Sequence, residues 1–356
     1  MSVLHTMTVI FPIKGIIEQV KSEDKAARNN GLDWTVKSFG TFSNDSEIFV
    51  KQSGKYNGLY SFRKNYYKWL NEEVKNGFYK TVLLRYQPYD IGQFFFIIRN
   101  RKKINIYLVL HTLAIQELSS DKKLASFAKA ILEMLIGPFS FNFVHGLISV
   151  TKEIGDKEQK RSFVLRPLKK LLYPNGILYN ENIMYVEDKR IGNIPELLFI
   201  ASSFAPWHGL DLLLKSIKNN KSDFVLHLVG NVPDEFSEDI NDSRIVQHGI
   251  VNPSKIKELT TTAWLGLSSF AHFRLKMKQA STLKVREYLA YGLPVYATYE
   301  ESFPIDFPFF RNDVCSIENI ISYANLMRNE SREKVSRLSK PFIDKAILLN
   351  NLYNEL

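Results

Sequence analysis

Short apolar runs rich in β-branched and aromatic residues alternate with amphipathic segments of helix length along most of this 356-residue chain. In the first half, the pattern predicts strands at 7–12, 34–39, 80–86, 104–110 and 143–150, and helices at about 15–30, 59–76, 90–100 and 122–136. The last of these helices is expected to end before Gly137-Pro138, because this pair stops helices. Strands that alternate with helical crossovers are typical of parallel sheets covered by helices.

A second series of the same kind follows a turn at Pro174-Asn175-Gly176 and a polar stretch that reaches about residue 193. Its predicted strands are 196–201, 224–229, 244–248, 263–268 and 294–298, and its predicted helices are about 208–219, 253–261 and 282–291. No repeat of 20 to 50 residues is apparent. The sequence therefore predicts two α/β domains, 1–180 and 190–340, and a terminal helix at 341–356.

Composition narrows the class of protein. With 45% hydrophobic and 24% charged residues, the chain can bury a substantial core. A single cysteine excludes an intrachain disulfide and a cysteine-based zinc site. The most apolar stretch, 127–150, is interrupted by Lys129, Glu133 and Pro138, so no transmembrane segment is expected. The N-terminus lacks a basic leader and a cleavage site, so secretion is not indicated. The single cysteine fits a reducing cytoplasm, and the expected location is the cytoplasm, with the inner face of the plasma membrane as an option.

The net charge of +10 is unevenly distributed. Residues 1–173 carry 27 Lys and Arg against 15 Asp and Glu, or +12, and the remainder carries 20 against 22, or −2. A basic domain attracts nucleic acid, an anionic membrane surface or a phosphate-bearing acceptor. The alternative is that the lysines only keep the protein soluble. No nucleic-acid-binding module is recognised, so charge is the sole support for that reading.

The segment 279–298, QASTLKVREYLAYGLPVYAT, carries the most chemistry. Small and capping residues precede a helix with a buried apolar face, and Gly292 and Pro294 end it. The free amides at the helix start, together with the Lys284 charge, are expected to bind a diphosphate, and Glu287 lies one turn inside, where it could accept from both ribose hydroxyls. The expected phosphate donors are Ser281, Thr282, Leu283 and Lys284. An ordinary capped helix would show the same letters.

This segment resembles the donor-site signature of retaining GT-B glycosyltransferases of the family 4-like, bacterial polysaccharide type. In that family a Glu-x7-Glu motif runs into a helix of the form SxLKxxEYLAxGxPV, and Thr282 to Val295 matches it closely. The resemblance implies that Glu287 binds the nucleotide ribose. Gln279 takes the place of the first Glu, which contacts the donor sugar near the reacting carbon, so this chain carries no negative charge there.

Two further segments agree with the family in order and spacing. Residues 198–214 resemble the first strand and loop of the C-terminal domain, with Ser203 and His208 at positions where an Arg and a Lys usually hold the donor phosphates. Two alternatives stay open for His208, which is either protonated beside a diphosphate or caps the following helix. Residues 224–251 resemble the strand ending in Gly and the HGxV turn, which implies that the backbone contacts the nucleobase. The donor-binding residues of this segment are Gly230, Gly249, Ile250 and Val251.

The first half carries weaker candidates for the acceptor side. His111 and Glu117 follow a predicted strand at positions where related enzymes place polar groups near the transferred sugar. The alternative for His111 is a strand-end histidine with a satisfied hydrogen bond. Arg85 has two equally weighted interpretations, as a contact to an acceptor phosphate or as a surface cation without a ligand. Arg274 either contacts the donor phosphates or an anionic acceptor, or it lies in a solvated loop.

Aromatic and basic residues gather at 60–69 (YSFRKNYYKW) and 94–103 (FFFIIRNRKK). Such a mixture suits an amphipathic face that dips into a membrane interface. Buried core aromatics beside surface lysines would give the same letters, so peripheral membrane contact through the basic domain is one of two readings.

Together these features predict an α/β protein of the GT-B class, with two Rossmann-like domains facing a central cleft and a C-terminal helix that crosses back to the N-terminal domain. The resemblance implies a retaining transfer of a hexose or hexosamine from a UDP- or GDP-sugar to a lipid-linked or oligosaccharide acceptor in cell-surface polysaccharide synthesis. No metal and no cofactor besides the nucleotide-sugar substrate are expected. The alternative is a non-catalytic GT-B subunit that binds or scaffolds an active glycosyltransferase, suggested by Gln279, Ser203 and His208.

Overall fold

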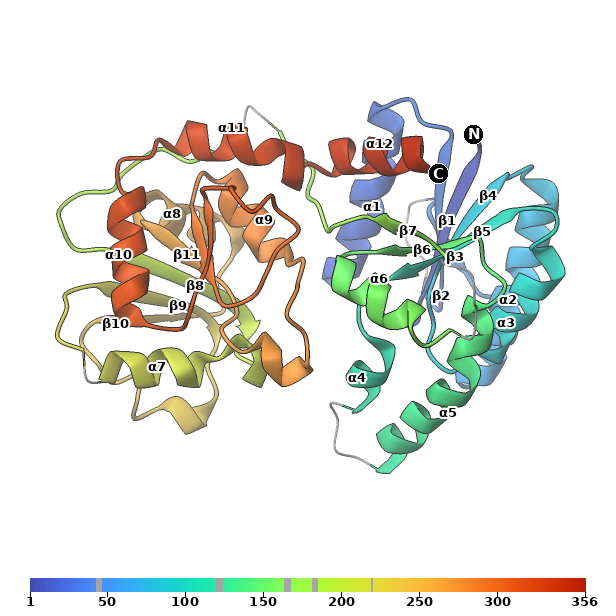
Figure 1. Ribbon diagram of the computed structural model, residues 1–356, viewed down its shortest axis with the longest axis horizontal. Coiled ribbons are helices and arrows are strands. Elements are labelled where there is room, and N and C mark those ends of the chain that lie inside the picture. The colour runs from blue at the N-terminus through green and yellow to red at the C-terminus, as the bar shows by residue number, and fades with distance from the viewer. Residues whose placement is uncertain (43–46, 120–123, 163–167, 181–184, 219) are drawn as a thin grey trace. The chain divides into compact units, whose positions relative to one another are not determined.

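The computed structural model describes residues 1–42, 47–119, 124–162, 168–180, 185–218 and 220–356. Contacts within the chain divide it into two compact units. The N-terminal unit consists of Met1–Pro174 together with Lys345–Leu356, and the C-terminal unit is Asn175–Asp344. Each unit is built around its own parallel sheet with helices on both faces (Figure 1).

Within the described residues, the sheet of the N-terminal unit has seven parallel strands in the order β3-β2-β1-β4-β5-β6-β7. The strands are β1 (Val3–Val9), β2 (Trp34–Gly40), β3 (Phe49–Lys51), β4 (Thr81–Arg85), β5 (Asn105–Leu110), β6 (Gly146–Ser149) and β7 (Lys169–Leu172). The helices are α1 (Lys14–Asn29), α2 (Leu59–Asn76), α3 (Ile91–Asn100), α4 (Ala114–Ser119), α5 (Leu124–Phe141) and α6 (Lys152–Gln159). The expected α/β class and most expected elements are therefore confirmed.

The first strand begins four residues earlier than predicted. The expected range was 7–12, but β1 covers Val3–Val9, and the polar His5 and Thr6 within it are buried. His5 Nδ1 lies 2.6 Å from the carboxylate of Glu23 on α1, and the hydroxyls of Thr6 and Tyr66 lie 3.3 Å apart. Glu23 and Tyr66 thus engage His5 Nδ1 and the Thr6 hydroxyl, although His5 Nε2 has no hydrogen-bond partner among the described residues. These contacts allow two polar residues to lie within a buried central strand.

The helix α5 does not end at Gly137-Pro138, as predicted, but continues to Phe141 with Pro138 inside it. Proline removes one backbone donor from a helix and disturbs the turn before it. A guanidinium group of Arg161 donates to the carbonyl oxygen of Glu133 at 3.2 Å, just before the disturbed turn. Of the described helices, α5 alone has the length and apolar composition to cross a membrane.

The C-terminal unit holds a sheet of six parallel strands, counted within the described residues, in the order β10-β9-β8-β11-β12-β13. The strands are β8 (Glu196–Ser203), β9 (Val225–Asn231), β10 (Ile245–Gly249), β11 (Leu265–Leu267), β12 (Val295–Ala297) and β13 (Phe310–Asn312). The helices are α7 (Leu210–Lys218), α8 (Pro253–Thr262), α9 (Leu283–Ala290), α10 (Ile317–Met327) and α11 (Arg332–Ile343), with short 3-10 turns η1 (Pro206–His208), η2 (Asp234–Phe236) and η3 (His272–Leu275). The strands β8, β9 and β11 are buried at their centres by both helical layers.

The expected terminal helix at 341–356 is two helices. α11 ends at Ile343, Asp344 adopts an extended conformation, and α12 (Lys345–Glu355) follows. α12 packs against α1 of the N-terminal unit (Figure 1). The Met1 amino group donates to the Tyr353 hydroxyl at 2.8 Å, and the Asn30 amide donates to the Ala346 carbonyl at 2.7 Å. The last helix is thus a structural part of the N-terminal unit.

Candidate functional site

The predicted donor-side residues of the C-terminal unit follow the carboxyl ends of neighbouring strands. Ser203 ends β8, Gly230 lies near the end of β9, and Gly249 ends β10. Since these three strands are adjacent and parallel, their ends lie along one edge of the sheet. Parallel α/β sheets bind ligands at this edge.

Gly230 is required by its backbone. Its φ angle is +120°, and a Cβ atom built on it would lie 1.5 Å from the carbonyl oxygen of Ala201 on β8. No side chain fits at that distance, so β8 and β9 can approach each other closely only with glycine there. Beyond β10, Ile250 is 82% exposed, and its neighbour Val251 packs partly on the core.

The helix α9 begins near the same edge, although its start differs from the prediction. Thr282 is the residue before the first turn, but its hydroxyl does not cap the helix and lies 3.0 Å from the Tyr299 hydroxyl instead. The Thr282 amide donates to the Glu301 carboxylate at 3.2 Å. One of the four predicted phosphate donors is therefore occupied. The amides of Leu283 and Lys284 donate to no acceptor within the described ranges.

A buried ion pair that the sequence did not reveal fixes the start of α9. Arg286 and Glu301 are both fully buried, and their nearest charged atoms are 2.6 Å apart. Arg286 Nε also donates to the carbonyl of Asn175 at 2.9 Å, and the Asn175 amide nitrogens donate to the hydroxyl and carbonyl of Ser281 at 2.9 and 2.6 Å. This network holds residues 281 and 282 in place, so Ser281 serves the frame of the site.

Lys284 is the most unusual residue of the site. Its Nζ is buried, has no hydrogen-bond partner among the residues that the structure describes, and lies 5.5 Å from the centre of the Phe199 ring. Burial lowers the pKa of Lys284 to about 8, with Glu287 acting weakly in the opposite direction. A buried ammonium without an acceptor is costly in the free protein. An anion bound beside it would supply the missing acceptors.

Glu287 lies one turn after Lys284 on the same side of α9. Its side chain is exposed, yet local desolvation raises the pKa of its carboxyl, and the nearby Lys284 charge lowers it by less. A carboxylate at this position can accept two hydrogen bonds from a polyol. The structure therefore groups the two predicted side chains, Lys284 and Glu287, beside the free amides of one helix end.

The structure decides between the two readings of His208 in the free protein. Burial, followed by the charges of Lys284 and His272, lowers the pKa of His208 to about 3, so the imidazole is neutral. Its Nδ1 accepts from the Ala205 amide at 3.0 Å, which closes the turn η1 and does not cap α7. The electrostatic influence of Lys284 on this pKa shows that His208 lies near the Lys284 charge.

Gln279 has a partner that sequence reasoning missed. Its amide nitrogen donates to the Glu300 carboxylate at 3.0 Å, and residues 279 and 300 form an isolated parallel bridge. Glu300 follows β12 and comes 21 positions later in the chain, so no local pattern pointed to it. A carboxylate therefore lies next to the position at which the resembled family carries its first Glu.

Arg274 is engaged within the C-terminal unit. Its guanidinium makes two bonds to the Asp211 carboxylate, at 2.9 and 2.6 Å, and a third to the Pro206 carbonyl at 2.6 Å. These bonds hold η3 against η1 and α7, and they hold the pKa of Asp211 below its usual value. The geometry favours a structural role over contact with an acceptor.

In the N-terminal unit, the structure brings Arg85 and His111 close together. Arg85 ends β4 and His111 follows β5, and these strands are adjacent. Desolvation lowers the pKa of His111 well below its usual value, and the charges of Arg85, His5 and Lys345 lower it further. The His111 imidazole is therefore neutral at physiological pH. The side chain of Glu117 lies outside the described part of the structure.

Comparisons with known proteins place the fold and not the reaction. No protein-family model matches the chain, and no curated protein matches it in sequence. Among solved structures, the apo form of the lipopolysaccharide outer core galactosyltransferase WaaB is 12% identical, with a TM-score of 0.66 and 100% of both chains covered. Anabaena Alr3699/HepE in complex with UDP is 11% identical, with a TM-score of 0.67 over 100% of this chain and 99% of the other. WaaG, a glycosyltransferase of lipopolysaccharide biosynthesis, is 14% identical, with a TM-score of 0.61 over 99% of each chain.

The same architecture also carries another activity. A putative UDP-N-acetylglucosamine 2-epimerase from Listeria monocytogenes is 12% identical, with a TM-score of 0.53 over 99% of this chain and 94% of the other. At such identities a likeness establishes the fold alone. The chain has the two-domain α/β architecture of GT-B glycosyltransferases, as the sequence predicted.

Proposed function

We propose that this protein is a retaining glycosyltransferase that moves a hexose or hexosamine from a UDP- or GDP-sugar to a lipid-linked or oligosaccharide acceptor in cell-surface polysaccharide synthesis. The observation that carries the proposal is the buried Lys284 ammonium, which has no partner within the described residues and lies at the free N-terminus of α9. Similar structures named for lipopolysaccharide synthesis or solved with UDP-glucose support the donor class.

In the proposed reaction, the bond between the anomeric carbon and the diphosphate oxygen breaks, and the acceptor hydroxyl forms its new bond on the same face of the sugar. The amides of Leu283 and Lys284 and the Lys284 ammonium stabilise the negative charge that develops on the leaving diphosphate. The acceptor proton passes to an oxygen of that diphosphate. Glu287 holds the ribose and so fixes the donor in register with the helix end.

Gln279 would contact the donor sugar through its amide. Its nitrogen donates to Glu300, and an amide oxygen is the kind of acceptor that a sugar hydroxyl requires. The Glu300 carboxylate supplies a negative charge close to the reacting centre, where the Gln279 side chain has none. Independence of a bound metal stays a prediction.

The proposal is tested by measuring donor binding and transfer with the purified chain. Thermal shifts with UDP, GDP and their sugars identify the nucleotide, and product analysis with lipid extracts follows. Lys284→Ala is expected to abolish both the nucleotide-dependent shift and the transfer. Lys215→Ala, at an exposed site on α7, is the matched control and should retain both. A Lys284→Ala variant with wild-type turnover would refute the phosphate assignment.

A second candidate, a non-catalytic subunit that binds or scaffolds an active partner, is favoured by one observation. His208, at the family's lysine position, is neutral, with one ring nitrogen tied to its own loop. The two candidates separate cleanly, because a non-catalytic subunit would show a nucleotide-dependent thermal shift but neither hydrolyse nor transfer any donor.

A further inference from the structure

The helix α5 exposes most of its large apolar side chains and buries the charged Glu133. Leu124, Phe127 and Leu135 are 84%, 61% and 62% exposed. Further exposed apolar side chains on this helix are Ile131, Leu132, Met134 and Phe139. Their spacing of three and four residues places most of them along one stripe. A surface helix of a water-soluble domain turns such a stripe toward the core, so this orientation is the reverse of the usual one.

Glu133, on the buried side of α5, anchors the helix to the N-terminal unit. Glu133 is fully buried and accepts from the Tyr86 hydroxyl at 2.6 Å and from the Tyr89 amide at 2.5 Å, and it also pairs with Arg161. The orientation of α5 is therefore held by a satisfied polar network. Because its middle is fixed to the unit in this way, the helix is suited to lie along an apolar phase and not to cross it.

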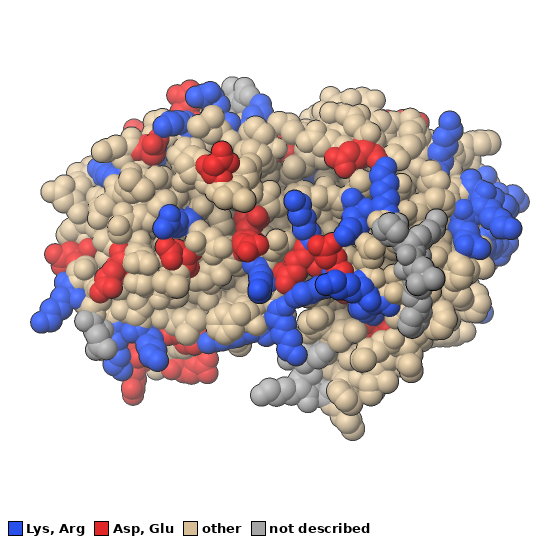
Figure 2. All heavy atoms as spheres, viewed as in Figure 1, with Lys and Arg blue, Asp and Glu red and all other residues tan. Residues whose placement is uncertain are grey.

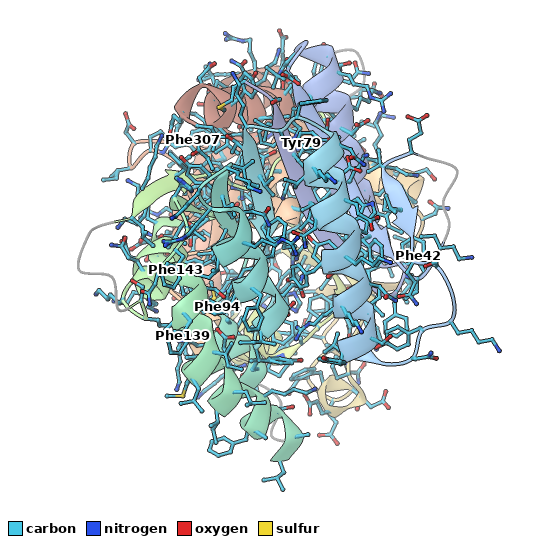
Figure 3. The ribbon with its side chains drawn as sticks, turned by 90° about the vertical axis from the view of Figure 1, so that its right-hand side faces the viewer. Phe42, Tyr79, Phe94, Phe139, Phe143 and Phe307 are labelled. Carbon is cyan, nitrogen blue, oxygen red and sulfur yellow. The ribbon has the colours of Figure 1, made fainter. Side chains whose placement is uncertain are left out.

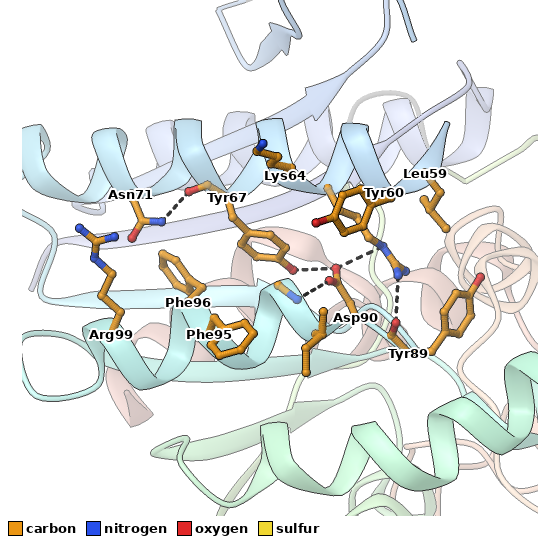
Figure 4. Close-up of a pocket in the computed structure, with 13 residues that line it drawn as sticks. Leu59, Tyr60, Lys64, Tyr67, Asn71, Tyr89, Asp90, Phe95, Phe96 and Arg99 are labelled. Carbon is orange, nitrogen blue, oxygen red and sulfur yellow. Dashed lines mark hydrogen bonds and ion pairs between the residues drawn. The ribbon is translucent and has the colours of Figure 1, made fainter. Parts of the chain in front are cut away.

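A pocket of about 570 Å³ opens between α2 and α3 in the same unit (Figure 4). Its walls are mostly apolar and aromatic, from Leu59, Tyr60, Tyr67, Ile91, Phe95 and Phe96. The charges at its floor are already paired, since Arg63 Nε lies 3.2 Å from the Asp90 carboxylate and the Tyr67 hydroxyl donates to the same group at 2.9 Å.

Two exposed cations among the lining residues remain, Lys64 and Arg99, for which no anionic partner is found in the described part of the chain. An apolar cavity with two such cations matches an amphiphile that has a hydrocarbon chain and an anionic headgroup.

The pocket and the exposed stripe of α5 are parts of one surface. Phe94 on α3 contacts the ring of Phe139 on α5 at 6.1 Å between centroids and that of Phe143 at 6.0 Å, and the three lie together in Figure 3. Phe94 also contacts Phe95, a pocket residue that is 62% exposed. We call this continuous surface the α3–α5 face.

The charges at the border of the α3–α5 face are positive. Residues 91–103 contain no Asp or Glu and carry four basic residues, namely Arg99, Arg101, Lys102 and Lys103. Lys129 adds an exposed charge on α5. In Figure 2, Lys and Arg gather at the right of the view, over α2 and α3, whereas the surface at the lower right, where α5 lies, is mainly uncharged. An apolar face bordered by cations is complementary to an anionic bilayer.

We propose that the α3–α5 face seats the N-terminal unit on an anionic phospholipid bilayer, with the stripe of α5 in the acyl–headgroup boundary and one lipid chain in the pocket between α2 and α3. The phosphate of that lipid lies against Lys64 and Arg99. This proposal does not depend on the transferase activity, and it assigns to α5 a contact that the fold itself leaves unused.

The first test is co-sedimentation of the full chain with phosphatidylcholine vesicles. One set contains no charged lipid, and the other contains about 30% phosphatidylglycerol, which makes the vesicle surface anionic. Binding is expected only with the anionic lipid and should weaken with salt. Phe127→Gln/Leu135→Gln is expected to lower the partition coefficient by roughly tenfold or more, because two exposed apolar groups no longer enter the bilayer.

The matched control is Ile305→Gln/Leu326→Gln, which changes two exposed apolar residues of the C-terminal unit and should bind as the wild type does. Unchanged binding by the Phe127/Leu135 variant, with its melting curve intact, overturns the proposal. A second contrary outcome is a wild-type protein that binds no vesicle and forms a dimer, together with a Phe127/Leu135 variant that is a monomer. The α3–α5 face would then join two copies of the chain. Resistance to extraction at alkaline pH would show a spanning helix and would also overturn the proposal.

The second test addresses the pocket. Dioctanoyl phosphatidylglycerol, below its critical micelle concentration, should raise the melting temperature of the wild type but not of Lys64→Gln/Arg99→Gln. Inorganic phosphate alone should raise neither. The charge-matched control is Lys215→Gln/Lys221→Gln, at exposed lysines of the C-terminal unit. An equal shift in the Lys64/Arg99 variant, or no shift in the wild type, refutes the lipid site.

Discussion

The buried ammonium of Lys284 makes the free protein less stable than it would be with an apolar side chain in the same place. Its pKa falls from 10.5 to about 8, mainly through burial. At 1.36 kcal/mol per unit, the ionised form costs about 3 kcal/mol of folding free energy, as an order of magnitude. Lys284→Met keeps the length of the side chain and its contact with Phe199, so at pH 7 the variant should be more stable by up to that amount.

The dependence on pH follows from the direction of the shift. The folded-state pKa lies below the unfolded one, so between about pH 8 and pH 10.5 the unfolded chain binds a proton that the folded chain has released. Wild-type stability should therefore rise through this window relative to Lys284→Met, and the difference should vanish above it. Urea unfolding at pH 7, 9 and 10.5, with Lys215→Met as the control, measures the effect. A variant that is less stable at pH 7, or a difference independent of pH, would contradict the reasoning.

A bound diphosphate should reverse the shift. An anion beside the ammonium raises the pKa of Lys284, so donor binding takes up a proton above pH 8. The affinity for the nucleotide should then fall by about tenfold per pH unit once the pH exceeds the free-state pKa. Calorimetry in buffers of different ionisation enthalpy detects the proton directly. Equal proton uptake by Lys284→Met would assign it to another group.

Three further changes probe the frame of the site. Gly230→Ala should destabilise the C-terminal unit by more than about 2 kcal/mol in a urea melt, because the strained φ angle and the blocked strand approach act together. Arg286→Met should cost about 3–5 kcal/mol and loosen the start of α9 in hydrogen exchange, since it leaves the Glu301 carboxylate buried and unpaired. The double change Arg286→Met/Glu301→Gln should recover part of that loss. Gln279→Glu sets a second carboxylate beside Glu300, and two neighbouring carboxylates share a raised pKa. The transfer rate of the variant, plotted against pH, should therefore show an additional titration step. A pH profile unchanged from wild type would exclude contact between the two side chains.

Much of the fold was readable because it rests on local periodicity. The predicted helix at 59–76 coincides with α2, and five of the six described strands of the C-terminal unit were located to within a few residues. The sixth, β13, was not predicted. The pattern failed where distant partners decide. His5 and Thr6 lie in a buried strand, where Glu23 pairs with His5 Nδ1 and Tyr66 contacts the Thr6 hydroxyl, and no neighbouring residue in the sequence signals such pairing.

The candidate site was likewise predictable only where its residues are close together in the sequence. Lys284 and Glu287 are one turn apart on one helix, so their spacing alone places them side by side. Glu300 and Glu301 reach the site from beyond the following strand, which only the folded sheet brings near. The sequence analysis did not single out Arg286, because its burial depends on the Glu301 carboxylate, 15 positions later in the chain.

Because α12 belongs to the N-terminal unit, that unit is the last to have all its residues synthesised, although most of it is translated first. The C-terminal unit holds all its residues once Asp344 has left the ribosome, whereas the N-terminal unit, although translated first, still lacks the helix that covers α1. A nascent chain stalled before Lys345 should hence present a protease-resistant second half beside an open first one. A stable partner fused after residue 356 would be tethered next to Met1, because the Met1 amino group contacts Tyr353 on α12.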